Sequence, residues 1–542
     1  MELHTKVLLQ VALCCAVVIA ATSQQLQPTR GEKLGTVDFP VSCEASQQAT
    51  FNRGIALLHD FWYDRAEHQF QEIVKADPTC AMAYWGEAMS LWHQIWDRPN
   101  EATLKRGLAL VQQAQKAGAK TQRERDYINA LAQFYQNYTN ASFETRVGAY
   151  SKAMAKLHET YPQDHEAAAY YALSLLAAAP PRDTTFTNQK KALAVLNEQF
   201  AIVGDNPGVA HYIIHSCDSP QMAAQGLKAA QRYGEIAPSA PHAAHMPGHI
   251  FARLGMWQED IHANLASVAA AEASGSYGHE LHAMDFLNYA YLQVGEDDKA
   301  KAIVTKVQTM DPMAGHDMHE YLDIARAGFA TTYEIEMRHW NKAASLDPSM
   351  ATKPENVAII YWARAIGGAH LHDAASAKEN LAHYDAMVEE VKKGPDAYIA
   401  EYMDTGRDEI RAWVAFAEEN NDEAVKIMRS VADKQDEYGK GEVEIPAREM
   451  LADILLESDH PQEALAEYEH SMKIDPNRFN GLYGAARAAQ MVRQPAAAQK
   501  YYAQLVKNCV GATSDRPELA RAREEVGERR LWPVTERFPP IS

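Results

Sequence analysis

Histidines are concentrated in one part of this chain, at spacings that suit metal coordination. Ten of the 22 histidines fall between residues 211 and 319. His211 with His215, and His245 with His249, have i,i+4 spacing, which places both imidazoles on one face of a helix, where a single transition-metal ion can bind them. A carboxylate from a neighbouring helix can complete such a set or orient an imidazole. The candidate ligands are His211, His215, His242, His245, His249, His279, His282, His316 and His319, with Asp218, Asp285 and Asp323 as further ligands or orienting groups.

The donor types indicate which ions would suit this region. Imidazole nitrogens bind zinc, copper, iron or nickel, whereas calcium requires mostly oxygen ligands. We therefore expect one site, or two, for a divalent transition metal such as zinc, copper or iron.

Two other interpretations of these histidines stay open. A groove lined by imidazoles could bind an acidic or aromatic partner without a metal. Imidazoles also titrate near neutral pH, so their mutual repulsion could open such a surface in acid. A single helical histidine is more often a core or surface residue than a ligand, and we assign that role to His262 and His339, which lie off the pattern.

The sequence leaves catalysis undecided. It contains no GxSxG nucleophile elbow, no P-loop, no HExxH zinc motif and no dinucleotide-binding glycine pattern. No residue is identifiable as a nucleophile, so metal-bound water or metal-bound oxygen would be the reactive group in any reaction.

Helices must position these side chains, because the chain has the pattern of helical hairpins. Alanine-rich stretches carry apolar residues at intervals of three and four, and no alternating strand pattern is evident. The predicted fold class is all-α. In residues 47–80, Gly54 and Ala66 are small enough for two helices to approach closely beside Phe70, and Pro78 ends the second helix. Asp-Pro also ends hairpins at residues 311–312, 347–348 and 475–476.

This hairpin pattern resembles the tetratricopeptide repeat (TPR), and the resemblance covers residues 47–512, more weakly around 100–200. It implies a right-handed superhelical solenoid whose concave groove is lined by one face of the first helix of each hairpin. In that register the histidines and aspartates of residues 205–325 line the groove, together with Arg253 as a binding residue. Residues 513–542 are expected to form a capping helix and tail.

The segment PHAAHMPGHIFARLG, residues 241–255, also resembles a histidine-rich HMPxHI segment in an exported subgroup of TPR-domain proteins. The resemblance supports the histidines as a unit but implies no particular reaction. Pro247 departs from ordinary repeats because it lacks a backbone donor, and it should kink this helix.

Trp85 and Trp92 form a separate aromatic patch. They could bind a peptide or a sugar ring, or they could pack against an N-terminal segment, which is the favoured interpretation.

The N-terminus predicts export. Residues 1–23 have the features of a signal peptide, with Lys6 before an apolar run and small residues at its end, and residues 24–46 follow as a linker. We expect a periplasmic or extracellular protein. In that oxidising setting Cys43 and Cys80 could pair, although buried free cysteines are also common in helical cores.

Charge and hydropathy exclude some partners. The net charge of −20 argues against nucleic acid and anionic lipid, and no later apolar run is long enough to span a membrane. The leading hypothesis is an exported TPR solenoid whose histidine-rich groove binds a transition metal, for binding alone or for metal-dependent chemistry on a small substrate. The alternative is a metal-free scaffold that binds a peptide or protein in the same groove.

Overall fold

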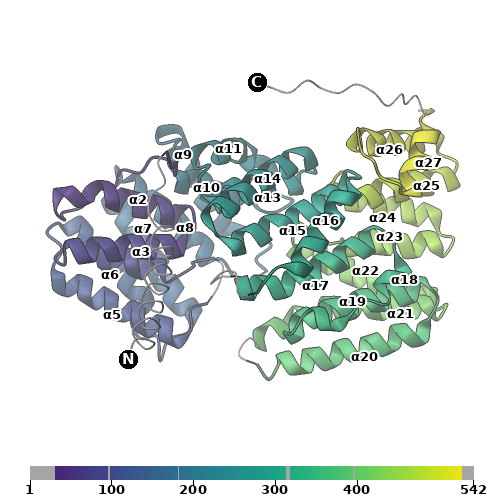
Figure 1. Cartoon of the computed structure of the whole chain (residues 1–542), viewed down its shortest axis with the longest axis horizontal. Coiled ribbons are helices and arrows are strands. Elements are labelled where there is room, and N and C mark those ends of the chain that lie inside the picture. The colour runs from purple at the N-terminus through teal and green to yellow at the C-terminus, as the bar shows by residue number, and fades with distance from the viewer. Residues whose placement is uncertain (1–30, 96–97, 181, 313–317, 395–396, 528–542) are drawn as a thin grey trace, which may run out of the picture. The chain divides into compact units, whose positions relative to one another are not determined.

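A computed structural model describes residues 31–95, 98–180, 182–312, 318–394 and 397–527. The predicted signal peptide and the end of the predicted tail lie outside these ranges. Across the described part of the chain the regular elements are all helices, and none is long and apolar enough to cross a membrane. Consecutive helices lie side by side as hairpins (Figure 1). This arrangement confirms the predicted all-α, TPR-like solenoid.

The chain forms two compact units. The first comprises residues up to 251 together with 262–283. Its helices are α2 Gln48–His59, α3 Tyr63–Ala76, α4 Ala81–Ser90, α5 Glu101–Ala117, α6 Gln122–Tyr135, α7 Phe143–Thr160, α8 His165–Ala177, α9 Thr187–Ile202, α10 Pro207–Cys217, α11 Ala223–Ile236, α12 Pro241–His245, and most of α13 Pro247–Arg253 and α14 Trp257–Ser274. A short 3₁₀ turn, η1 Ala45–Gln47, precedes α2. The stretch in which the repeat pattern is weak, residues 100–200, contains α5 to α9.

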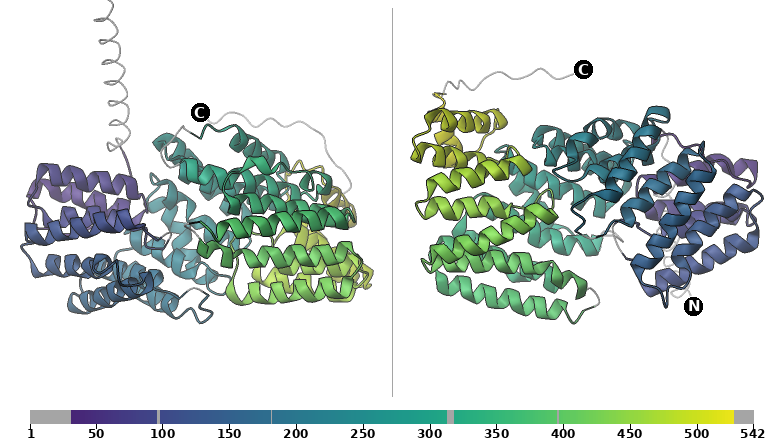
Figure 2. Two further views of the ribbon diagram at one scale, coloured as in Figure 1. Left: turned by 90° about the horizontal axis from the view of Figure 1, so that it is seen from below. Right: turned by 180° about the vertical axis from the view of Figure 1, so that it is seen from behind.

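The second unit comprises residues 252–261 and those from 284 onward. Helix α15, Tyr277–Gln293, contributes to both units. The further helices, visible as a stack of hairpins in Figure 2, are α16 Asp297–Thr309, α17 Met318–Glu336, α18 Trp340–Ala343, α19 Pro354–His370, α20 Ala374–Val391, α21 Met403–Ala417, α22 Asn421–Tyr438, α23 Ala447–Glu457, α24 Pro461–Ile474, α25 Phe479–Met491, α26 Pro495–Asn508 and α27 Pro517–Glu525, with 3₁₀ turns η2 Pro348–Met350 and η3 Ala397–Glu401.

The predicted hairpin register is explained by a close contact in the first repeat. A Cβ atom on Gly54 would lie 2.7 Å from the ring of Phe70, so only glycine lets α2 and α3 approach this closely. Phe70 is fully buried there. Small and large residues at fixed spacing thus build the hairpin, as the repeat pattern requires.

The N-terminal segment is fixed to the first unit by a disulfide and by aromatic packing. Cys43 and Cys80 are joined, which selects the paired alternative that the sequence left open. Phe39 is fully buried, with its ring centroid 5.7 Å from that of Trp85 and 4.9 Å from that of Tyr127. The two remaining described cysteines, Cys217 and Cys509, are buried free thiols.

A buried charge network lies inside the second unit. The guanidinium of Arg478, with a side chain only 1% exposed, lies 2.7 Å from a carboxylate oxygen of Glu336 and 2.9 Å from one of Glu449. Asn480 donates to the same Glu336 carboxylate over 2.9 Å. These contacts tie α17, α23 and α25 together. Because each buried charge has an ionic partner, removal of one group would leave the others uncompensated.

Candidate metal centre

Helix α10 carries the first pair of histidines and has a strong start signal. The side chain of Asn206 accepts a hydrogen bond from the backbone N–H of Val209 over 3.2 Å, and Pro207 occupies the first turn, where its missing N–H has no cost. A Cβ atom on Gly208 would lie 2.3 Å from Nδ1 of His59, so glycine is needed for α10 to approach the end of α2. This approach brings His211 over that end.

The second pair spans a break in the helix, as predicted. Helix α12 ends at His245 and α13 begins at Pro247. The Met246 N–H still donates to the carbonyl of His242 over 2.9 Å, but Pro247 has no N–H for the preceding turn. His245 and His249 therefore project from two short helices.

The structure brings together a first group of three histidines, here called triad A: His211 and His215 from α10 and His242 from α12. One nitrogen of each lies within 4.8 Å of the others. The Nε2 atoms of His211 and His242 are 3.2 Å apart. Nδ1 of His211 lies 2.5 Å from the backbone carbonyl of His59, which can only accept, so Nδ1 carries the proton and Nε2 presents a lone pair.

A second group, triad B, consists of His245, His249 and His282, again with one nitrogen of each within 4.8 Å of the others. The Nε2 atoms of His245 and His249 are 3.0 Å apart. Nδ1 of His245 lies 2.6 Å from the amide oxygen of Asn264, and Nδ1 of His249 lies 3.0 Å from a carboxylate oxygen of Asp218. Both Nδ1 atoms therefore donate, and both Nε2 atoms present lone pairs at this short separation.

The two triads adjoin each other. The ring centroid of His242 is 5.9 Å from that of His245, and that of His215 is 6.4 Å from that of His249. His279, the one predicted ligand between residues 211 and 282 that belongs to neither triad, lies beside triad A, with its ring centroid 5.7 Å from that of His242. These imidazoles form one continuous layer within the first unit.

Burial keeps several of these rings uncharged. It lowers the pKa of His211 to about 3, and it lowers the pKa of His242 and His245 well below the usual value, with repulsion from neighbouring imidazoles as a further cause. All three are at most 2% exposed, whereas His215, His249 and His282 are half-buried. Each triad therefore combines buried, uncharged imidazoles with half-buried ones.

The distances suit a transition metal. Ligand nitrogens at about 2.0–2.1 Å from a tetrahedral zinc ion are about 3.3 Å apart, close to the separations of the Nε2 pairs in both triads. Three neutral imidazoles leave a fourth position for water or a substrate. The arrangement can thus bind an ion and leave it reactive.

A polar network beneath triad A was not predicted from the sequence. The His59 ring lies 2.8 Å from the hydroxyl of Tyr212 and 2.6 Å from a carboxylate oxygen of Glu166. Asn206 donates to the other oxygen of that carboxylate over 2.7 Å. Phe61 stacks on His215 and His242, with centroids 5.5 and 5.6 Å away. The contacts of His59 join residues 153 and 107 positions apart in the sequence, so no local pattern predicts them.

The other two predicted aspartates, Asp285 and Asp323, and Arg253 belong to the second unit. The Asp323 carboxylate accepts from the backbone N–H groups of Thr352 and Lys353 over 2.7 and 3.0 Å. Asp285 is half-buried, and burial together with nearby Glu444 and Glu442 raises its pKa to about 7. Arg253 donates to the carbonyl of Lys440 over 2.9 Å. His316 lies outside the described residues, as does the side chain of His319.

Both predicted tryptophans are buried in the core of the first unit. Trp85 is 2% exposed and packs against Phe39 of the N-terminal segment, and Trp92 is fully buried with its ring stacked 3.5 Å from that of Phe134. Neither ring face is open to a ligand, because both rings pack against other side chains in the core. His262 is exposed, and His339 lies 2.7 Å from a Glu334 carboxylate oxygen.

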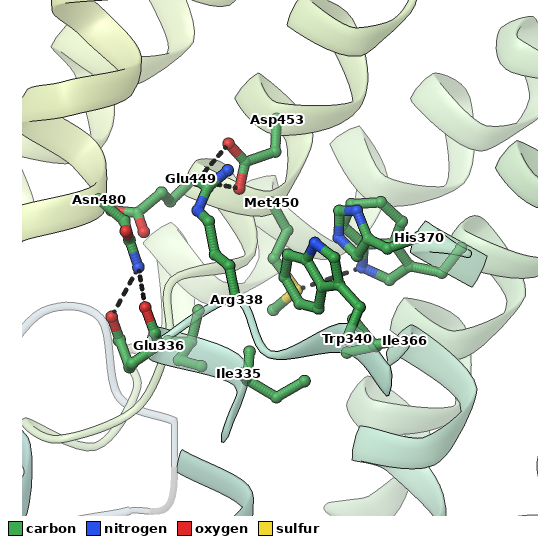
Figure 3. Close-up of a pocket in the computed structure, with 12 residues that line it drawn as sticks. Ile335, Glu336, Arg338, Trp340, Ile366, His370, Glu449, Met450, Asp453 and Asn480 are labelled. Atoms are coloured by element: carbon green, nitrogen blue, oxygen red, sulfur yellow. Dashed lines mark hydrogen bonds and ion pairs between the residues drawn. The ribbon is translucent and has the colours of Figure 1, made fainter. Parts of the chain in front are cut away.

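A small cavity within the second unit is separate from this chemistry. Figure 3 shows Arg338 facing Asp453, and Trp340 beside His370, with centroids 3.7 Å apart. Nitrogen Nη2 of Arg338 lies 3.0 and 3.2 Å from the two Asp453 oxygens. The cavity measures about 20 Å³, room for a single water molecule. Its charges are paired, which suits a structural role.

Comparisons with known proteins do not identify a function for the site. No protein-family profile and no curated protein matches the sequence. The structure of Naa15/Naa10 bound to HypK-THB is similar over 88% of this chain and 74% of that chain, at 12% identity and a TM-score of 0.23. The human IFIT1 dimer with m7Gppp-AAAA is similar over 87% and 91%, at 11% identity and a TM-score of 0.35. Similarity at this level carries no functional information.

Proposed function

We propose that this protein binds transition-metal ions through triads A and B. The observation that supports the proposal best is the contact between Nε2 of His245 and Nε2 of His249 at 3.0 Å. Because both Nδ1 atoms face acceptors, Asn264 and Asp218, neither Nε2 carries a hydrogen in the neutral ring. Two lone pairs this close repel each other unless a cation lies between them, and a metal ion satisfies both.

The surroundings of the rings support the same proposal. The Asn264 amide and the Asp218 carboxylate hold the far side of each ring, which is how ligating histidines are usually oriented. Asn264 is fully buried, so this contact is not a chance surface encounter. A metal held by three imidazoles keeps an open position, so the site would serve either binding or metal-dependent chemistry on a small substrate.

Export is part of the proposal. The joined Cys43 and Cys80 support it, because disulfides persist in oxidising compartments and are rare in the cytosol. The predicted signal peptide at residues 1–23 points the same way.

Elemental analysis of the untagged mature chain, purified without chelator, tests the proposal. We expect stoichiometric metal, and a loss of metal in His245→Ala and in His249→Ala with helicity unchanged. His262→Ala is the matched control, because His262 is an exposed histidine on α14 outside the layer. Unchanged metal content in both layer variants would contradict the proposal. A clean absence of metal after reconstitution with zinc, copper and iron would leave the metal-free scaffold for a peptide or protein partner as the better description.

A further inference from the structure

Residues 32–43, here called the strap, precede the first helices of the first unit. The strap belongs to the segment predicted as a linker, yet it is part of the folded unit. Leu34 and Phe39 are buried. The disulfide between Cys43 and Cys80 fixes the far end of the strap.

The strap is bonded to α2, the helix that orients His211. Nitrogens Nε and Nη2 of Arg53, on α2, lie 2.8 and 3.1 Å from the two carboxylate oxygens of Glu32. Such a bidentate ion pair fixes the geometry of both groups. Helix α2 ends at His59, whose carbonyl accepts the hydrogen bond from Nδ1 of His211.

The strap also contacts the beginning of α10, the helix that carries two ligands of triad A. The backbone N–H of Thr36 donates to the carbonyl of Asp205 over 2.9 Å, two residues before α10 begins at Pro207. A Cβ atom on Gly35 would lie only 2.7 Å from Cδ of Pro207. Only glycine therefore lets the strap and α10 approach this closely.

A third contact reaches the beginning of α12, which carries His242. The backbone N–H of Lys33 donates to the hydroxyl of Ser239 over 2.8 Å, and the N–H of Ser239 donates to the carbonyl of Lys33 over 3.2 Å. Helix α12 begins two residues later, at Pro241. One short segment thus contacts α2 and the starts of α10 and α12, the three elements from which triad A is built.

Triad B depends on other elements. Its ligands come from α12, α13 and α15, and Asn264 of α14 orients one of them. In the described part of the chain, no hydrogen bond or ion pair joins the strap to α13, α14 or α15. Only α12 is common to both triads.

We infer that the strap is a positioning element for triad A, an inference that rests on the proposed metal binding. It holds α2, α10 and α12 at the separation at which His211, His215 and His242 can bind one ion. Ligand distances at a metal site are fixed to within about 0.2 Å, so a small shift of α10 weakens binding. Linkage makes the effect reciprocal, and an ion in triad A holds the strap more tightly.

The first experiment measures zinc affinity by chelator competition in the full mature chain. His282→Ala cripples triad B and leaves triad A to be measured, and His215→Ala does the reverse. In each background Gly35→Ala adds a methyl group that cannot fit beside Pro207 and must separate the strap from α10. We expect about a 10-fold loss of affinity at triad A, as for the loss of other orienting contacts, and a much smaller change at triad B.

Gly31→Ala is the matched control. Gly31 and Gly35 have φ angles of +94° and +84°, so alanine is strained at both positions, but a Cβ atom on Gly31 meets no atom within 4 Å. Zinc affinity at both triads should therefore stay unchanged in Gly31→Ala.

The second experiment uses the reciprocal effect and does not depend on the folding of Gly35→Ala. Amide exchange at Thr36 reports release of the strap, because its N–H is bonded to the carbonyl of Asp205. Zinc should slow this exchange by about 10-fold, the same factor that the strap contributes to affinity. The slowing should persist in His282→Ala and disappear in His215→Ala.

The outcomes separate this inference from the proposed metal binding. Equal losses of zinc affinity at the two triads in Gly35→Ala, or equal losses in Gly35→Ala and Gly31→Ala, would overturn the positioning role and leave metal binding intact. Exchange at Thr36 that does not respond to zinc would do the same. A chain that binds zinc at neither triad would remove the proposed metal binding, and this inference with it.

Discussion

The contact between Asn264 and His245 allows a quantitative test of how the site is oriented. Asn264 is fully buried on α14, and its amide oxygen lies 2.6 Å from Nδ1 of His245. In Asn264→Ala the ring loses the acceptor that fixes its tautomer and its orientation. Loss of such a partner lowers metal affinity by about 10- to 100-fold, or about 1.4–2.7 kcal/mol. We expect that loss for the ion of triad B alone.

The assay is competition with a chromophoric chelator, which yields separate affinities for the two ions. Ser267→Ala is the matched control, because Ser267 lies one turn further along α14, is equally buried, and donates only to the carbonyl of Pro241 over 2.7 Å. Both variants should lose about 1 kcal/mol of unfolding free energy with the buried hydrogen bond. Only Asn264→Ala should weaken metal binding.

Two results would refute this reasoning. Equal loss of affinity in both variants would mean that the effect arises from a general loosening of α14. Unchanged affinity in Asn264→Ala would mean that the amide does not orient a ligand.

Three further predictions concern stability. Burial raises the pKa of Glu409 to about 8, so the folded state holds its proton more tightly than the unfolded chain, and the free energy of unfolding should fall by roughly 3–5 kcal/mol as the pH rises from about 4.5 to about 8. Glu409→Gln should abolish this fall in thermal melts at pH 4 and pH 9. An equal loss of stability between these two pH values in the variant and in the unmodified protein would contradict the assignment. Replacing Cys43 and Cys80 by alanine should cost about 3–4 kcal/mol, because the bond closes a loop with a sequence separation of 37; an unchanged melting temperature under oxidising conditions would argue against the bond. Arg478→Met should lower the free energy of unfolding by about 3–5 kcal/mol, because two buried carboxylates lose their cationic partner. Arg411→Met, at an exposed ion pair, should lower it by at most about 1 kcal/mol. Similar melting temperatures for the two variants would show that the buried network contributes little.

The fold could be predicted because its determinants are local. The spacing of Gly54 and Phe70 within one hairpin is a direct consequence of how two adjacent helices touch. The break at Pro247 follows in the same way from a missing backbone donor. Signals of this kind are contained in short windows, so a single sequence reveals them.

The candidate site could be predicted only in part. The pairs of imidazoles follow from helical spacing, but the partner that fixes the tautomer of His211 is the carbonyl of a residue 152 positions away. The role of Asn264 likewise depends on how α14 packs against α12. The division of the layer into two triads arises from the same tertiary packing. Trp85 was ambiguous for a related reason, since burial decides between a binding ring and a core ring.

Each triad takes its ligands from successive helical hairpins, and this has a consequence for how the chain unfolds. In a repeat array, stability is approximately the sum of terms for each repeat and for each interface with its neighbour. An ion bound by α10 and α12, or by α12, α13 and α15, adds directly to these interface terms. The metal-loaded hairpins should therefore open as one cooperative block, and the metal-free chain should lose amide-exchange protection hairpin by hairpin along this stretch.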